Sequence, residues 1–120
     1  MSVRDTAEIV PWETHPGIRV RVAGSGEKMT MLYGRAQPET EIPAHKHPHE
    51  QLGFCIEGEA AYRIGDKTFL VKKGCSFLIP PNAVHSAKVG PKQEYVVVEV
   101  FSPTRQDLLK GEFTPEKFDE

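Results

Sequence analysis

Histidines occupy three of the five positions from 45 to 49, in the segment Pro43–Gln51. In an extended backbone, side chains two positions apart point to the same face of the chain, about 6.5 to 7 Å from each other. The imidazoles of His45 and His47 can therefore converge on one metal ion, a role that histidine commonly fills. Gln51 follows four residues after His47 and offers an amide oxygen as a further ligand.

A fourth ligand has to come from another part of the chain. His85 is the natural candidate, because the turn-forming residues at positions 80–82 return the chain into a new strand near this imidazole. His49 shares the spacing of the ligands and is an alternative to Gln51, although we expect it beside the ligands and not among them. His15 is expected to lie in solvent. Donors of this kind predict a divalent metal site.

The predicted ligand set is neutral, which bears on the chemistry of the ion. Three imidazoles and one amide leave the charge of a divalent cation uncompensated, so the ion would be a strong Lewis acid and a good host for an anion. Imidazole-rich sites accept several transition metals, and the sequence does not choose among nickel, zinc, iron, manganese, cobalt and copper. We therefore expect one divalent transition metal and a small anionic organic substrate.

A fold made mainly of strands must position these residues. Glycine and proline, ten of each, fall between short apolar segments, as in many-stranded folds. Residues 18–22 alternate apolar with charged side chains, so that one face is buried while Arg19 and Arg21 face water. Gly65 and Asp66 predict a two-residue hairpin turn with Gly65 at positive φ. Further strands are predicted over residues 28–36, 51–57, 60–64, 68–71, 76–79, 84–89 and 93–101.

The last predicted strand is followed by the only predicted helix. On that strand Glu99 lies on the same face as Phe101, and three valines share the opposite face. The helix is predicted over residues 103–110, with Ser102 as N-cap, a proline at the first helical position and Gly111 beyond the end. We expect the charged tail, residues 111–120, to be partly disordered unless its phenylalanines dock on the domain.

The composition restricts the class of protein and its partners. A chain of 120 residues suits one domain, expected over residues 1–120 with a core from about 18 to 101. Lysine and arginine total 15 against 17 acidic residues, so no excess of positive charge favours nucleic acid or a membrane surface. No apolar segment is long enough to span a bilayer, and the first residues do not form a secretory signal, so we expect a cytoplasmic protein.

Two further patterns concern the cysteines and the surface. Cys55 and Cys75 lie in apolar segments and are interpreted as buried free thiols, with a disulfide as the less favoured alternative. Leu52, Phe54 and Ile56 share one face of their strand, and they either pack inside the monomer or contact a second copy. Because a small barrel has exposed strand edges that a second copy can cover, we favour a homodimer.

The spacing of the histidines resembles the two sequence motifs of the cupin superfamily. The motifs are matched by His45, His47, Gln51 and Gly58, and by Gly74, Pro80 and His85. The chain resembles a single-domain member, or monocupin, from about residue 18 to residue 101. The resemblance implies a small double-stranded β-helix, a jelly-roll-like barrel, that binds a divalent metal. The ligand positions of the family fall on His45, His47, Gln51 and His85.

Four positions depart from the motifs of that family. Glu39 and Asn82 stand where the motifs usually have glycine, and Val89 stands where the second motif usually ends in asparagine. Gln51 replaces the more common glutamate. Only this last difference bears on the chemistry, and related small cupins also carry glutamine there.

The end of the chain is similar to the small cupins of pectin breakdown, which convert 4,5-unsaturated uronates to their linear keto form. The similarity covers residues 98–105 and implies an acid, usually aspartate, an aromatic ring and an arginine beside the metal, at Glu99, Phe101 and Arg105. There the arginine would hold a substrate carboxylate, the acid would move a proton and the ring would pack on the sugar. The leading hypothesis is a metal-dependent isomerase or lyase. A non-haem dioxygenase and a non-catalytic metal- or ligand-binding protein are the alternatives.

Overall fold

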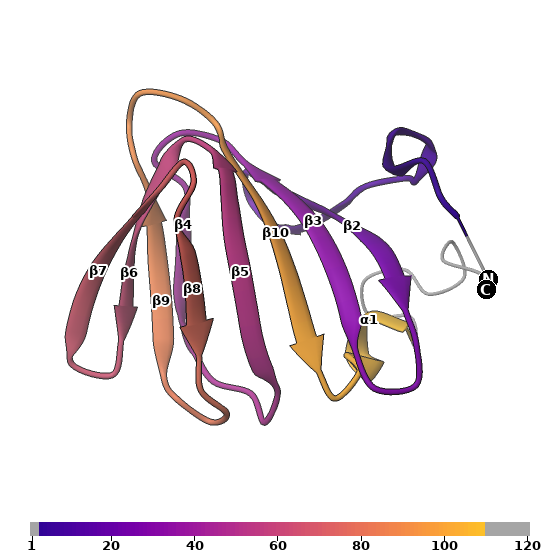
Figure 1. Cartoon of the computed structure of the whole chain (residues 1–120). Helices are drawn as coiled ribbons and strands as arrows, with labels where there is room; N and C mark the ends of the chain where they lie inside the picture. Colours follow the sequence, from indigo (N-terminus) through magenta and orange to yellow (C-terminus); the bar gives the residue numbers. More distant parts are fainter. Residues whose placement is uncertain (1–2, 110–120) are drawn as a thin grey trace.

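The computed structural model describes residues 3–109 and is built almost entirely of strands (Figure 1). The strands are β1 (Trp12–His15), β2 (Ile18–Ser25), β3 (Thr30–Ala36), β4 (Glu41–His45), β5 (Glu50–Glu57), β6 (Glu59–Ile64), β7 (Lys67–Lys72), β8 (Ser76–Ile79), β9 (His85–Val89) and β10 (Tyr95–Ser102). A 3-10 helix, η1 (Thr6–Glu8), precedes them, and a short α-helix, α1 (Gln106–Leu109), follows them. The predicted class, all-β with one short α-helix near the end, is confirmed.

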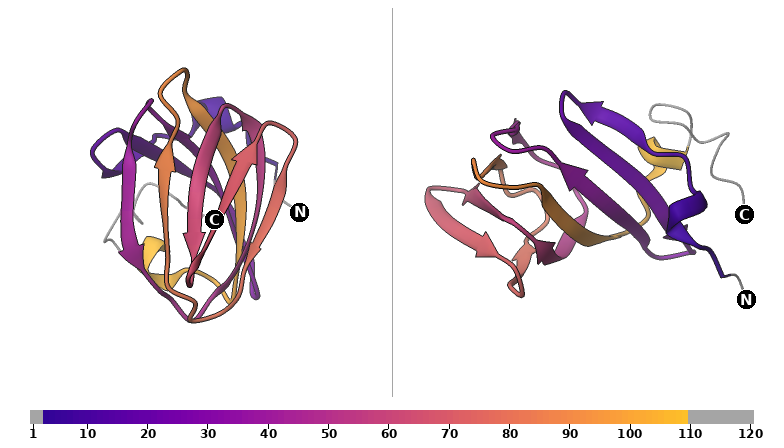
Figure 2. Two further views of the ribbon diagram at one scale, coloured as in Figure 1. Left: turned by 90° about the vertical axis from the view of Figure 1, so that its left-hand side faces the viewer. Right: turned by 90° about the horizontal axis from the view of Figure 1, so that it is seen from above.

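Within the described residues, the strands form two antiparallel sheets (Figure 2). The first sheet has the strand order β1-β2-β3-β10-β5-β8, and the second has the order β4-β9-β6-β7. Strands that are distant in the chain become neighbours, since β10 lies between β3 and β5 while β9 lies between β4 and β6. This crossing between sheets is typical of jelly-roll barrels. It brings the segment that ends at His45 beside the segment that begins at His85.

Alternate side chains of the strands fill the space between the two sheets. The three apolar residues of the predicted 18–22 strand are buried, and Arg19 faces solvent as predicted. Arg21 is only half exposed, because its Nε donates a hydrogen bond of 2.9 Å to the carbonyl of Ile9. A smaller apolar cluster joins Leu108 of α1 to Phe101 of β10 and to side chains of β2 and β3. The short helix therefore packs onto the interior side of the first sheet.

Two strands, β1 and β4, are missed by the sequence prediction. In β4 only Ile42 is even partly buried, so the strand shows no alternation of apolar with polar residues. The reason is that its end faces the histidine cluster and not the apolar core. β1 is an edge strand of four residues that pairs with β2 alone, and its half-buried pattern is too short to stand out.

The helix begins later than the sequence predicts. Ser102 remains the last residue of β10, where its Oγ donates a hydrogen bond of 2.7 Å to the carbonyl of Lys28, and it does not cap a helix. The backbone N–H of Arg105 donates to Thr30 Oγ1 at 2.9 Å. These two bonds hold residues 102–105 along the sheet, so the helix starts only at Gln106. The predicted helix end at Lys110 and Gly111 and the predicted tail lie outside the described residues.

Several turns depend on residues with positive φ. Gly65 has a φ of 62° between paired residues of β6 and β7, which confirms the predicted hairpin. Glu39 and Asn82 have φ values of 66° and 65°. These are the two motif positions at which this chain departs from glycine, so the backbone keeps the left-handed conformation although the residue has changed.

Both cysteines are free, as predicted: Cys55 is buried and Cys75 is half-buried. Leu52, Phe54 and Ile56 are 53%, 49% and 36% exposed, so the alternative that places them inside the monomer is wrong. None of the helices in the described part of the chain has the length and apolarity that crossing a bilayer requires.

Candidate metal centre

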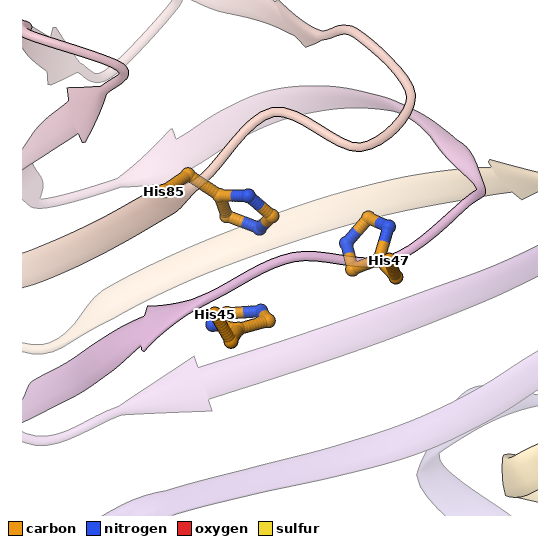
Figure 3. A group of neighbouring side chains, drawn as sticks. All are labelled: His45, His47 and His85. Carbon is orange, nitrogen blue, oxygen red and sulfur yellow. The ribbon is translucent and has the colours of Figure 1, made fainter.

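His45, His47 and His85 point toward one another (Figure 3), and they are exposed, half-buried and buried, respectively. One ring nitrogen from each residue lies within 4.8 Å of the others. His45 ends β4 and is the register partner of His85, which begins β9, so strand pairing sets two of the three side chains. His47 lies in the loop after β4. The backbone of that loop is held by a hydrogen bond of 2.8 Å from the Asn82 N–H to the His47 carbonyl. The structure therefore brings together the three histidines singled out as ligands.

Hydrogen bonds to the backbone set the tautomer of all three rings. The Nδ1 atoms of His45, His47 and His85 lie 2.9, 3.1 and 2.9 Å from the carbonyl oxygens of Pro43, His49 and Ala83, respectively. A carbonyl oxygen only accepts, so each Nδ1 must carry the hydrogen and donate it. Each Nε2 then keeps its lone pair. This is the arrangement in which a neighbouring backbone group orients a metal-binding histidine.

Gln51 lies beside the three histidines and is oriented by Glu99. The Nε2 of Gln51 donates a hydrogen bond of 2.7 Å to Glu99 Oε2, which turns the amide oxygen toward His47, 3.1 Å from its Nε2. Both facing atoms are acceptors in this tautomer, so they repel each other unless a cation lies between them. Two ligands held at right angles, each about 2.1 Å from an ion, are about 3.0 Å apart. The four side chains thus fit a divalent transition metal.

Burial shifts the pKa of three groups at this site, His47, His85 and Glu99. Desolvation is the largest cause that lowers the pKa of His47 and of His85, and the charge of Arg105 adds to it in both cases. Imidazoles that remain neutral are the form that binds a metal. Burial raises the pKa of Glu99, against the opposing effects of the hydrogen bond from Gln51 and the charge of Arg105.

A cavity of about 140 Å³ opens beside the histidines. Polar side chains that line it include the three histidines, Gln51, Glu99 and Arg105, and its apolar lining includes Leu32, Ile42 and Phe101. One water molecule takes about 30 Å³ in the liquid, so the cavity suits a small organic molecule and not a polymer.

Arg105 is held in place over the aromatic ring of Phe101. Its guanidinium carbon lies 4.7 Å from the centre of that ring. Its Nε and Nη2 donate hydrogen bonds of 2.9 and 2.6 Å to the carboxylate of Asp107, which does not line the cavity. This contact uses one side of the guanidinium and leaves the pair of N–H groups at its end free to bind a carboxylate. Arg105 in turn lowers the pKa of Asp107.

The sequence of residues 32–101 matches the family model of the cupin domain. The chain belongs to the cupin family. Over 96 residues it is 25% identical to the H2HPP isomerase of Bacillus subtilis, a match that covers 79% of this chain and 39% of that protein. This cupin therefore spans about two fifths of the length of that curated relative.

Solved structures of other cupins have the same fold. The structure of KdgF from Halomonas sp. superposes with a TM-score of 0.84 at 22% identity, over 91% of this chain and 99% of that one. An RmlC-like cupin from Shewanella frigidimarina NCIMB 400 gives a TM-score of 0.83 at 20% identity, over 90% of this chain and 96% of that one. These likenesses confirm the predicted monocupin barrel.

The cavity of this cupin is lined by the three residues that the pectin-cupin resemblance places beside the metal, Glu99, Phe101 and Arg105. Phe101 lies edge-on to His47, with ring centres 5.6 Å apart, and Glu99 reaches the cluster through Gln51. His49 is not among the converging ligand atoms. It instead donates from Nε2 to the carbonyl of Thr104 at 3.2 Å, beside Arg105.

Two residues near the cavity were not predicted to act there. His15 is half-buried and lines the cavity, so the expectation that it lies in solvent is wrong. The strand β1 carries it there, and that strand was itself missed. Asp107 lies within the predicted helix, residues 103–110, and no role at the site was predicted for it. Its position two residues after Arg105 was the available indication of an ion pair. Oppositely charged residues at this spacing are also common on protein surfaces, where ion pairs contribute little to stability.

Proposed function

We propose that this cupin is a metal-dependent isomerase of a small carboxylated, sugar-like molecule of the 4,5-unsaturated uronate class. The observation that carries the proposal is the composition of one small cavity. It holds a neutral ligand set, a carboxylate that is not a ligand, Glu99, and an arginine with a free pair of donors, Arg105. The name of the relative from Bacillus subtilis, an isomerase, and the fold shared with KdgF support this class of reaction.

The conversion to a linear keto form is an isomerisation. The bond between the hemiacetal carbon and the ring oxygen breaks, the hemiacetal hydroxyl loses a proton and the alkene carbon gains one, so no atom enters or leaves. A bound divalent ion would supply Lewis-acid polarisation of a substrate oxygen. His45, His47, Gln51 and His85 would hold that ion.

The remaining steps fall to residues of the chain itself. Arg105 binds the substrate carboxylate with the N–H groups that Asp107 leaves free, which sets the position of the ring. Phe101 packs against the sugar and keeps water from that face. Glu99 is the group that carries the proton from the hydroxyl to the alkene carbon, through the carboxylate oxygen that Gln51 does not contact.

The test is whether metal-loaded protein converts a 4,5-unsaturated uronate under anaerobic conditions. The conversion is measured as the loss of the alkene absorbance of the substrate. Glu99→Gln should lower kcat by about 10² to 10⁴, the usual cost of losing one positioned acid or base, with metal content and melting temperature unchanged. Arg105→Ala should act mainly through KM. Absence of conversion by the wild-type protein would refute the uronate proposal, and substrate-dependent oxygen uptake would favour the dioxygenase instead.

A further inference from the structure

The peptide group between Thr104 and Arg105 is held on both sides by side chains from other parts of the fold. Its N–H, which belongs to Arg105, donates a hydrogen bond of 2.9 Å to Thr30 Oγ1 on β3. Its carbonyl, which belongs to Thr104, accepts a hydrogen bond of 3.2 Å from His49 Nε2, in the loop between β4 and β5. These partners are 75 and 55 residues away in the sequence. Two distant elements therefore fix a single peptide group.

The local backbone around Arg105 is too short to fix its own position. The Gln106 N–H donates to the Thr104 carbonyl at 3.1 Å, which closes a tight turn with Arg105 at its centre. The described helix α1 has four residues, and isolated helices shorter than about 12 residues are marginal in water. Leu108 anchors this helix to the sheet, but it lies beyond Arg105 in the chain. The direction in which the Arg105 side chain leaves the backbone therefore depends on Thr30 and His49.

The hydroxyl of Thr30 is fully buried and has two polar neighbours. Ser25 Oγ and the Arg105 backbone nitrogen each lie 2.9 Å from Thr30 Oγ1. An N–H only donates, so Thr30 Oγ1 accepts from Arg105 and shares a second hydrogen bond with Ser25. Burial of a hydroxyl costs free energy unless it is hydrogen-bonded, and valine has nearly the same shape without that cost. The bonds to Ser25 and Arg105 are thus what a threonine supplies at this position.

The ring of His49 makes one hydrogen bond among the described residues, the one to Thr104. A carbonyl only accepts, so His49 Nε2 carries the hydrogen and Nδ1 keeps a lone pair. That Nδ1 is buried and has no hydrogen-bond partner in the described part of the chain. Because an unsatisfied buried polar atom destabilises a fold, stability alone does not explain a histidine here. The backbone of the same residue orients His47, whose Nδ1 donates to the His49 carbonyl at 3.1 Å.

We propose that Thr30 and His49 are positioning residues that together direct Arg105 into the cavity, where it binds the substrate carboxylate. This inference rests on the role of Arg105 in the proposed function. Asp107 orients the guanidinium at the end of the side chain, whereas Thr30 and His49 fix the backbone from which the side chain starts. With both ends held, the guanidinium carbon lies 4.7 Å from the centre of the Phe101 ring. His49 thus connects the loop of the proposed metal ligands with the arginine that binds the carboxylate.

Kinetics with the 4,5-unsaturated uronate test the proposal through paired variants. Thr30→Val and His49→Ala each remove one of the two hydrogen bonds, and each should lower kcat/KM about 10- to 100-fold, because a misplacement of about 1 Å can cost this much. Thr30→Ser keeps a hydroxyl and His49→Gln keeps an N–H donor, so these matched controls should retain most of the activity. Metal content should stay unchanged in His49→Ala, because His47 is oriented by the backbone carbonyl of residue 49.

A double-mutant cycle separates positioning from a general loss of stability. In the Arg105→Ala background, neither Thr30→Val nor His49→Ala should lower kcat/KM further, since both residues act through Arg105. A purely structural role would give the same loss with or without the arginine. Losses that multiply in full with that of Arg105→Ala would overturn the proposal.

Amide hydrogen exchange tests the same contacts without substrate. The backbone N–H of Arg105 should exchange slowly in the wild-type protein and about tenfold faster or more in Thr30→Val and His49→Ala. Asp107→Asn frees the guanidinium but leaves the peptide group held, so its Arg105 N–H should exchange as slowly as in the wild-type protein. His49 is half-buried and lies in a loop, so its variants decide the question if Thr30→Val does not fold.

Unchanged exchange of the Arg105 N–H in the folded variants would contradict the proposed positioning. The exchange measurement also distinguishes this failure from a failure of the proposed function. If the wild-type protein converts no uronate but both variants lose the slow exchange, the uronate proposal fails while the positioning of Arg105 by Thr30 and His49 stands.

Discussion

At the scale of single residues, the pair of Gln51 and Glu99 explains how this site works with an amide where glutamate is more common. The amide NH₂ donates to Glu99, so its oxygen has to face the histidines. The carboxyl group that is absent from the four side chains beside the cluster lies one contact further out, at Glu99. A glutamate at position 51 would place two carboxylates at hydrogen-bond distance, where like charges oppose ionisation of both. Glutamine at this position and an acid at position 99 are therefore complementary.

Asp107→Asn tests whether Asp107 positions Arg105. The variant removes the carboxylate that accepts from Nε and Nη2, so the guanidinium gains freedom while the local positive charge increases. We expect kcat for the uronate to fall about 10- to 100-fold through lost positioning, with no rise in KM, since the anion is attracted at least as strongly.

Nitrogen-15 NMR supplies a second measurement that does not depend on the substrate. The Nε–H signal of Arg105 should exchange slowly in the wild-type protein and quickly in Asp107→Asn. Asp66→Asn, in the hairpin between β6 and β7, is the control and should change neither measurement. A higher KM with an unchanged kcat would mean that Asp107 contributes only to binding.

At the scale of elements, the turns before and after the strands hold the site in register. The Asn82 N–H ties the loop before β9 to the carbonyl of His47, and the Glu39 N–H ties the turn before β4 to the carbonyl of Gly90 at 3.1 Å. Each of these two turns needs one left-handed residue. The histidine strands β4 and β9 are thus joined both by their ladder and by turns at both ends.

Glu39→Gly should stabilise the protein. A residue with a Cβ costs about 1 to 2 kcal/mol in the left-handed region, and the greater freedom of glycine in the unfolded chain offsets part of the gain. We expect a net increase of about 0.5 to 1 kcal/mol in the free energy of unfolding, or roughly 2 to 5 °C in melting temperature. Lys92→Gly, an exposed loop position without positive φ, is the control and should not stabilise. Equal shifts in both variants would show that the left-handed turn is not strained.

At the scale of the whole molecule, the candidate metal centre would link the two sheets. Of the proposed ligands, His45 and His85 come from the second sheet and Gln51 comes from the first, so one ion would crosslink both layers of the barrel. The unfolded chain cannot hold the four donors together. Metal binding should therefore act as a stabilising contact between the sheets.

Removal of the metal should lower the melting temperature. At a free metal concentration of about 100 times Kd, binding to the folded state contributes about 2.7 kcal/mol, which corresponds to roughly 10 °C for a domain of this size. A chelator should cause this loss in the wild-type protein and none in His47→Ala, which should bind no metal. His15→Ala changes another histidine of the cavity that is not among the converging ligands, and it should respond to the chelator as the wild-type protein does. Full metal occupancy in folded His47→Ala would refute the ligand assignment.

The sequence by itself determined those features that depend on short-range periodicity. Alternation at residues 18–22 predicts a strand with one buried face, and Gly65 predicts a hairpin because its φ is a local requirement. The spacing of His45 and His47 predicts that the two rings lie close together, and they do, although β4 ends at His45 and His47 lies in the loop after it. The position of His85 after a turn predicts a strand that begins there, as the structure shows. Such features can be predicted without knowing which residues of the opposite sheet pack against them.

Only the tertiary structure decided which faces meet. On β5 the large side chains of Leu52 and Phe54 are of the type that fills a core, yet they point outward because the ring of Phe77 fills the space over Gly53. Contacts across the barrel, such as Gln51 with Glu99, join residues 48 positions apart, and no local pattern specifies them. His15 reaches the cavity because the end of the edge strand β1, which pairs with β2, forms part of the cavity lining. Periodicity determines which residues share a face, but the shape of the opposite layer determines whether that face is inside.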